Sequence, residues 1–140
     1  MTKLTTMFAT AALLLAISAP AMAGQTYDLS IPVSADLTGV TFNGNAITGL
    51  EVRCQLFNAS NALLLTKAAP LDGLKVPQQN VLISITVPDG ITPAKSYTCA
   101  FGFKIPSMGA GDNGYFFPAP GADLGNVVKA STFITRSGTL

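Results

Sequence analysis

Apolar and polar residues alternate one by one along most of this chain, and this period of two constrains its fold more than any other feature. In an extended strand, successive side chains point to opposite faces. The clearest segment, residues 97–105, places on one face Tyr97, Cys99, Phe101, Phe103 and Ile105. No window repeats apolar residues at helical spacing. The chain is therefore expected to be an all-β protein.

Five further segments are predicted to be strands, because each alternates or is rich in apolar and β-branched residues between turn signals. They are residues 27–33, 50–56, 63–65, 81–87 and 127–135. Pro32 removes a backbone donor and places the first strand at a sheet edge. Residues 63–65 are interpreted as a short buried strand, and residues 70–79 as a crossing loop that could contain one short edge strand. About seven strands without a helix predict a two-sheet β-sandwich.

Residues 1–23 have the three parts of a secretory signal peptide. Lys3 gives a positive start, residues 7–17 form an apolar run, and Ala21-Met22-Ala23 matches a cleavage site of small residues. The run is shorter than the roughly 20 residues that cross a bilayer, so cleavage is expected rather than membrane insertion. We expect one mature domain, residues 24–140, that a bacterial cell sends to the periplasm or secretes.

Cys54 and Cys99 are the only cysteines of the chain, and export would place them where thiols are oxidised. A catalytic thiol needs a neighbouring base, and the chain contains no histidine. A structural disulfide is therefore predicted. Both cysteines lie on apolar faces of different strands, as a bridge between two facing sheets would require.

The charges of the mature chain are few, balanced and scattered. Lys3 is one of eight basic residues, so the remaining seven balance the seven acidic ones, and charged residues make up 11% of the whole sequence. Nucleic-acid binding needs clustered cations, so this partner class is not expected. A surface rich in Thr, Ser, Asn, Gln and Gly suits a neutral partner, either a protein or a neutral glycan.

The cysteine strands resemble those of immunoglobulin-like domains. Cys54 within residues 50–56, and Tyr97-Thr98-Cys99 after residues 91–96, are similar to the second and sixth strands of that family. The resemblance implies an immunoglobulin-like sandwich with one inter-sheet disulfide, and it implies that Tyr97 is the tyrosine corner, whose hydroxyl bonds to the chain just upstream. The chain has no tryptophan, so a constant-type or fibronectin-like relative fits better than a variable domain.

A second resemblance is to bacterial fimbrial subunits, which are incomplete immunoglobulin-like sandwiches with one disulfide. In that family an alternating N-terminal strand completes a neighbouring subunit. Residues 27–33 have the pattern of such a donor strand. Pairing of this strand within its own chain is the alternative that the sequence leaves open.

Neither catalysis nor a cofactor is expected, since histidine is absent and the acidic residues lie mostly at turns. Asp112-Asn113-Gly114 with Asp123 could hold calcium, although turn chemistry explains these residues better and no metal site is predicted. Asn58-Ala59-Ser60 matches the N-glycosylation pattern and is interpreted as a turn.

The long loop of residues 109–125 is the candidate binding segment, because it carries three adjacent rings, Tyr115, Phe116 and Phe117. The rings either contact a partner or fold back to cap the core. We predict an exported binding or assembly protein that is not an enzyme.

Overall fold

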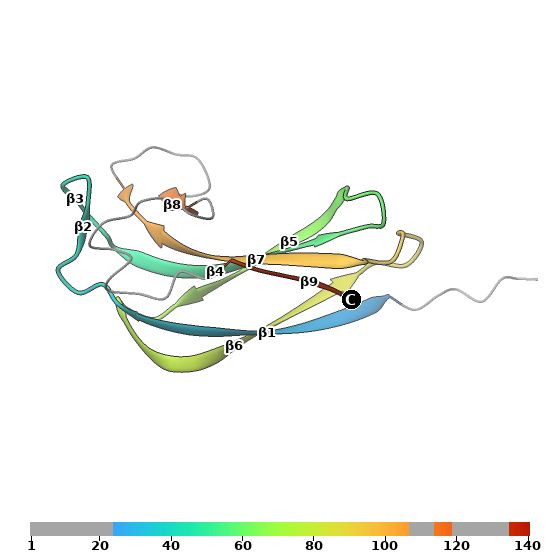
Figure 1. Ribbon diagram of the computed structural model, residues 1–140, viewed down its shortest axis with the longest axis horizontal. Coiled ribbons are helices and arrows are strands. Elements are labelled where there is room, and N and C mark those ends of the chain that lie inside the picture. Colours follow the sequence, from blue (N-terminus) through green and yellow to red (C-terminus); the bar gives the residue numbers. More distant parts are fainter. Residues whose placement is uncertain (1–23, 107–113, 119–134) are drawn as a thin grey trace, which may run out of the picture.

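The computed structural model describes residues 24–106, 114–118 and 135–140 and shows an all-β protein (Figure 1). Its strands are β1 Gln25–Asp36, β2 Thr41–Phe42, β3 Asn45–Ala46, β4 Gly49–Phe57, β5 Leu63–Leu71, β6 Lys75–Val87, β7 Ser96–Lys104, β8 Tyr115–Phe116 and β9 Arg136–Thr139. The predicted signal peptide and residues 127–134 of the predicted last strand lie outside the described residues. Nowhere in the described ranges does the chain form a helix with the length and apolarity that a membrane crossing requires.

The strands form two layers that face each other (Figure 1). One layer is an antiparallel ribbon of β1 and β6. The other is a larger sheet in the order β5-β4-β7, in which β8 and β9 both pair with β7. The small hairpin β2–β3 turns at Asn43 and Gly44, whose φ angles are 49° and 77°, as a two-residue hairpin turn requires.

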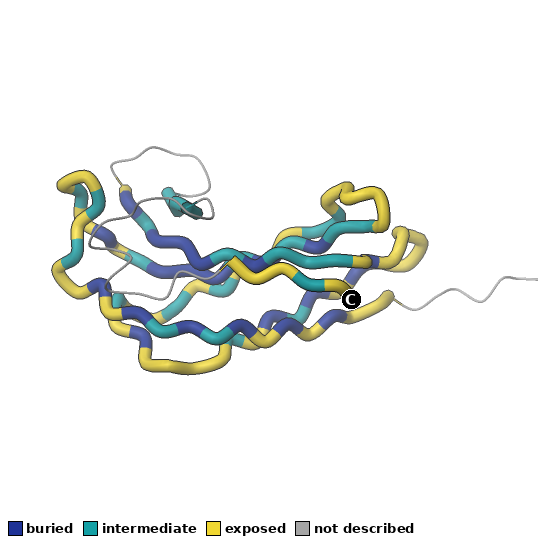
Figure 2. The backbone as a smooth tube through the Cα atoms, viewed as in Figure 1, coloured by how far each residue is buried: buried dark blue, intermediate teal, exposed yellow. Residues whose placement is uncertain are grey.

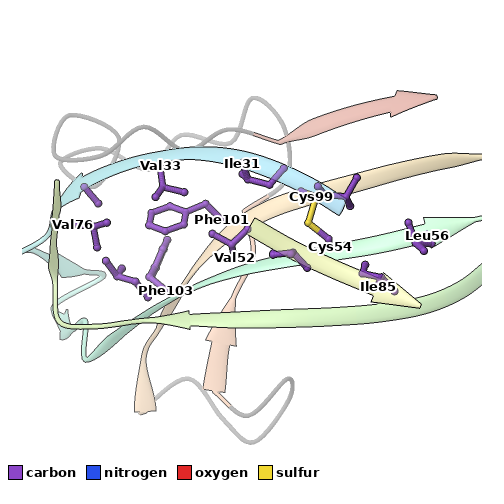
Figure 3. Packing of buried hydrophobic residues seen from close by; sticks show 14 of the residues in the cluster. Ile31, Val33, Val52, Cys54, Leu56, Val76, Ile85, Cys99, Phe101 and Phe103 are labelled. Carbon is purple, nitrogen blue, oxygen red and sulfur yellow. A yellow bond between two sulfur atoms is a disulfide. The ribbon is translucent and has the colours of Figure 1, made fainter. Parts of the chain in front are cut away.

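The core lies between the two layers and comes from the alternation seen in the sequence. Buried and exposed positions alternate along β1 and along the second half of β6 (Figure 2). The inward residues of β4 are 0% exposed, namely Leu50, Val52, Cys54 and Leu56. They face Ile31, Val33 and Ile85 of the ribbon, with Phe101 and Phe103 of β7 beside them (Figure 3). The all-β prediction and its inward faces are thus confirmed.

The Cys54–Cys99 disulfide is present, but the expectation that it joins two sheets is wrong. Cys54 of β4 lies directly opposite Cys99 of β7 in the same sheet, with the two Cα atoms 4.0 Å apart. Alternation reveals which face a cysteine occupies, but it does not reveal which strand is its neighbour. Such a bridge indicates that the chain folds in an oxidising compartment, outside the cytoplasm.

The expectations for residues 63–79 were only partly right, because residues 63–65 do lie in a strand, but the strand is not buried and the expected loop is short. Leu63 begins β5, which is an edge strand of the large sheet, and its side chain is 52% exposed rather than buried. The expected crossing loop is instead the end of β5, a short turn with φ of 72° at Gly73, and the start of β6. Pro70 fits into β5 because a strand edge tolerates a missing donor. Pro77 falls where the register between β1 and β6 shifts, at a bulge.

A tyrosine hydroxyl does bond to the segment just before Tyr97, but it belongs to Tyr27 of β1. The Tyr27 hydroxyl accepts a hydrogen bond from the Ala94 backbone N–H at 3.1 Å and donates to Oε1 of Gln25 at 2.7 Å. It ties β1 of the ribbon to the segment that leads into β7. The Tyr97 ring lies instead over Gly138 of β9, where an added Cβ would come within 2.6 Å of a ring carbon.

Candidate functional site

The three rings of the candidate binding segment do not share one role, because strand alternation separates them. β8 pairs with β7 so that Tyr115 lies opposite Lys104 and Phe116 opposite Phe103. Phe103 is on the inner face of the sheet and Lys104 is on the outer face. Phe116 therefore belongs to the core side, while Tyr115 and Phe117 belong to the outer face.

Phe116 packs against the end of the core. Its ring centroid lies 5.3 Å from that of Phe42 in a stacked arrangement and 5.3 Å from that of Phe103. Phe42, in the β2–β3 hairpin, also meets Phe103 edge-on at 5.5 Å. These three rings join the hairpin, β7 and β8, so the contacts of Phe116 are those of a core cap.

Phe117 covers the outer face of the large sheet at a position prepared by a glycine. A Cβ added to Gly102 of β7 would lie 2.5 Å from the Phe117 ring, so any larger residue at 102 would displace that ring. The guanidinium carbon of Arg53 lies 4.0 Å from the Phe117 ring centroid, within cation–π range. The sequence signal that could have revealed this contact is Gly102, because it is the one residue without a side chain in a strand of larger residues.

Next to the Phe117 ring, β4 carries an ion pair. Its burial was not predicted from the sequence. Nη2 of Arg53 lies 3.0 Å from Oε1 of Glu51, and the Arg53 Nε donates to the same oxygen at 3.1 Å. Glu51 is only 5% exposed, and among the residues that the structure describes it is the one charged residue that is buried. The two residues are separated by two positions and so share the outer face. The Glu51 carboxylate is therefore both buried and paired with a guanidinium.

Tyr115 completes the aromatic side of this face. Its hydroxyl lies 3.3 Å from the point where a Cβ on Gly49 would sit, and its ring centroid is 5.8 Å from Nζ of Lys104. Burial raises the pKa of the Tyr115 phenol, the Glu51 carboxylate raises it further, and the Arg53 guanidinium partly opposes the increase. The folded protein therefore favours the neutral phenol.

We expect Tyr115 to titrate above the ordinary tyrosine pKa of about 10. The difference between the phenolate absorbance of the wild type and of Tyr115→Phe isolates this group, and in Glu51→Gln the same titration should move to lower pH. Because the raised pKa favours the protonated form in the folded state, the stabilising contribution is complete below pH about 10 and is lost as pH rises through the folded value. A difference titration centred at or below the ordinary value would contradict this assignment.

Farther along the same outer face, a row of uncharged polar side chains crosses four strands. Gln55 of β4 lies opposite Thr66 of β5 and opposite Thr98 of β7, and Thr98 lies opposite Ser137 of β9. The hydroxyls of Thr98 and Ser137 are 3.0 Å apart. The next row on this face consists of Arg53 of β4 between Ala68 of β5 and Ala100 of β7. This row was not identified from the sequence, since it needs the strand order.

Other candidate groups contribute little to a site. Within the described ranges no three His, Cys, Asp or Glu side chains gather as metal ligands, and Asp112, Asn113 and Asp123 lie outside those ranges. The Asn58 side chain accepts hydrogen bonds from the backbone N–H groups of Ser60 and Ala62 at 3.0 and 2.9 Å. This confirms the turn interpretation of Asn58-Ala59-Ser60.

Known proteins provide no further guide to this face. Comparison with protein-family models, with curated proteins and with solved structures finds no match for the chain.

Proposed function

We propose that this chain is an exported, non-enzymatic binding module that holds an uncharged partner on the outer face of the large sheet. The favoured partner is a neutral glycan, and an uncharged protein surface is the other member of this class. The observation that carries the proposal is the polar row of Thr66, Gln55, Thr98 and Ser137, which lies on the same outer face as the Phe117 ring and is separated from it by Arg53 and Ala100.

The chemistry of this face suits sugar hydroxyls. Threonine and serine hydroxyls both donate and accept hydrogen bonds, and the Gln55 amide offers separate donors and an acceptor. Of the charged residues on this face, Glu51 and Arg53 are paired with each other at 3.0 Å and Arg53 lies against Phe117, while Lys104 lies beside Tyr115, away from the polar row. A charged ligand would find little there to compensate its lost hydration, whereas a neutral one loses less.

We also propose that the sandwich is immunoglobulin-like. In that family the larger sheet of variable-type domains has the strand order C′-C-F-G. The order β5-β4-β7-β9 corresponds to it, with β1 and β6 as two strands of the opposite sheet. Under this correspondence Cys99 keeps the sixth-strand position, while Cys54 takes the third-strand position in place of the expected second. The bridge then joins strands C and F of one sheet.

An array of immobilised neutral and acidic glycans tests the binding proposal. The double variant Gln55→Ala/Thr98→Val should weaken binding to the neutral glycans that the wild type retains by roughly tenfold or more. Thr86→Val is the control, because it removes one hydroxyl of a similar pair, Thr26–Thr86 at 2.9 Å, from the opposite layer. Equal loss in both variants, or retention only of acidic glycans, would contradict the proposed face. Binding to a protein but to no glycan, lost in the double variant, would identify the other partner class.

Assembly by donation of the N-terminal strand is the alternative function. The observation that favours it is the position of β1, which is the first described strand, forms half of a two-stranded layer and buries alternate apolar residues. Its pairing with β6 along residues 25–36 of the same chain favours the stand-alone module instead. Deletion of residues 24–36 separates the two. A stand-alone module should unfold or aggregate, whereas a subunit should fold and lose only its polymerisation.

A further inference from the structure

Lys67 occupies a position that the pattern of the sheet assigns to an apolar residue. It lies in β5 directly opposite Cys54, whose side chain points into the core. Residues opposite each other in a sheet share a face, so Lys67 begins on the inner face. The other inward positions of β5 are apolar, namely Leu65, Ala69 and Leu71. Because β5 is an edge strand, the long Lys67 side chain still reaches water.

The ammonium group of Lys67 crosses to the other layer. Its Nζ donates a hydrogen bond of 2.7 Å to the backbone oxygen of Ser84 in β6. In an antiparallel pair each residue directs its N–H and its C=O to the same side. Since the Ser84 oxygen is bonded by Lys67 of β5, the backbone groups of Ser84 point away from β1. Lys67 therefore occupies the open edge of β6, at the seam between the two layers.

An open edge of this kind is a template for pairing with another chain. Among the described strands, β6 pairs only with β1, so none of them pairs with the other edge of this 13-residue strand. The edge strands β1 and β5 contain Pro32 and Pro70, and proline lowers their pairing capacity. The segment of β6 from residue 79 onward contains no proline. An incoming strand there would have to displace Lys67 from Ser84 and bury an ammonium without its acceptor.

We propose that Lys67 guards the open edge of β6 and prevents a second copy of this chain from pairing with it. The second copy is the relevant partner because it brings an identical long edge in the opposite direction, and two β6 edges can then exchange backbone hydrogen bonds about a twofold axis. Inward-pointing charges on edge strands act against such pairing in general. The domain stays a discrete unit, and its outer polar face stays free.

The variant Lys67→Met tests this proposal, because methionine has a side chain of similar length but no charge. Lys67→Arg, which keeps the charge, is the matched control. Sedimentation of the exported full chain over a concentration series should show that Lys67→Met associates at a roughly tenfold lower concentration than the wild type, while Lys67→Arg does not. Lys67→Thr, which is too short to reach Ser84, should behave like Lys67→Met and serves where the methionine variant does not fold. Unchanged mass in both uncharged variants, with native circular dichroism, would overturn the proposal.

The site of association is tested by adding Ser84→Pro to Lys67→Met. The Ser84 N–H faces the open edge, so proline removes a donor needed by an incoming strand and leaves the pairing with β1 intact. The double variant should return to the mass of the wild type. Association of the double variant at the concentration of the single one would show that the copies meet elsewhere, and the assignment of the guarded edge to β6 would be wrong.

Discussion

Replacement of both Cys54 and Cys99 by alanine should lower the free energy of unfolding by about 2–4 kcal/mol. The bridge closes a loop with a sequence separation of 45, and it therefore restricts the unfolded chain strongly. Both cysteines are 0% exposed at the centre of the inner face, so alanine also leaves some space unfilled. Urea unfolding without reductant, monitored by circular dichroism, measures the change.

Reduction provides the control for this experiment. A reductant should shift the unfolding midpoint of the wild type toward that of the double alanine variant, and it should leave the variant itself unchanged. Because β4 and β7 are already hydrogen-bonded neighbours, the variant should still unfold in one transition. A loss below about 0.5 kcal/mol, the range of harmless surface substitutions, would mean that the strand pairing alone supplies this stability.

Phe103→Ala should destabilise the domain by about 3–5 kcal/mol. The Phe103 ring is 0% exposed and contacts the rings of Phe42 and Phe116 at 5.5 and 5.3 Å. Its loss removes a large apolar group and also the platform on which the β2–β3 hairpin and β8 rest. Thermal and urea unfolding report the effect.

Phe57→Ala is the matched control for Phe103→Ala, because Phe57 is the same residue type on the outer face of β4 and is only half-buried. Phe57→Ala should lower the free energy of unfolding clearly less than Phe103→Ala does. If the two variants lost equal stability, the core would not be centred between the layers at β7, and the packing described for the three rings would be wrong.

The face of a strand on which each residue lies could be predicted from the sequence. Which strands lie side by side could not. Alternation alone predicted that Leu50, Val52, Cys54 and Leu56 point inward, and all four are buried. The same alternation is compatible with several strand orders, so the cysteines were expected in different sheets. Lys67 shows the same limit, because its inward position follows only from its pairing with Cys54.

The position of the three adjacent rings follows from the sequence, but their arrangement does not. Their division into Phe116 on the core side and Tyr115 and Phe117 outside depends on the pairing of β8 with β7. The Glu51–Arg53 pair could be located on one strand face from its spacing. Its burial could not, because the cover comes from Phe117, distant in sequence, and from the absence of a side chain at Gly102.

The cross-strand bridge also determines how this molecule would respond to mechanical tension. A pull on the two ends of the chain would reach β1 from one side and β9 from the other. The segment between Cys54 and Cys99, which contains β5 and β6, is a covalently closed loop and cannot be drawn out while the bridge is intact. Extension would therefore be confined to the terminal segments. The closed loop would retain β6 as a template on which β1 could reform once the tension ends.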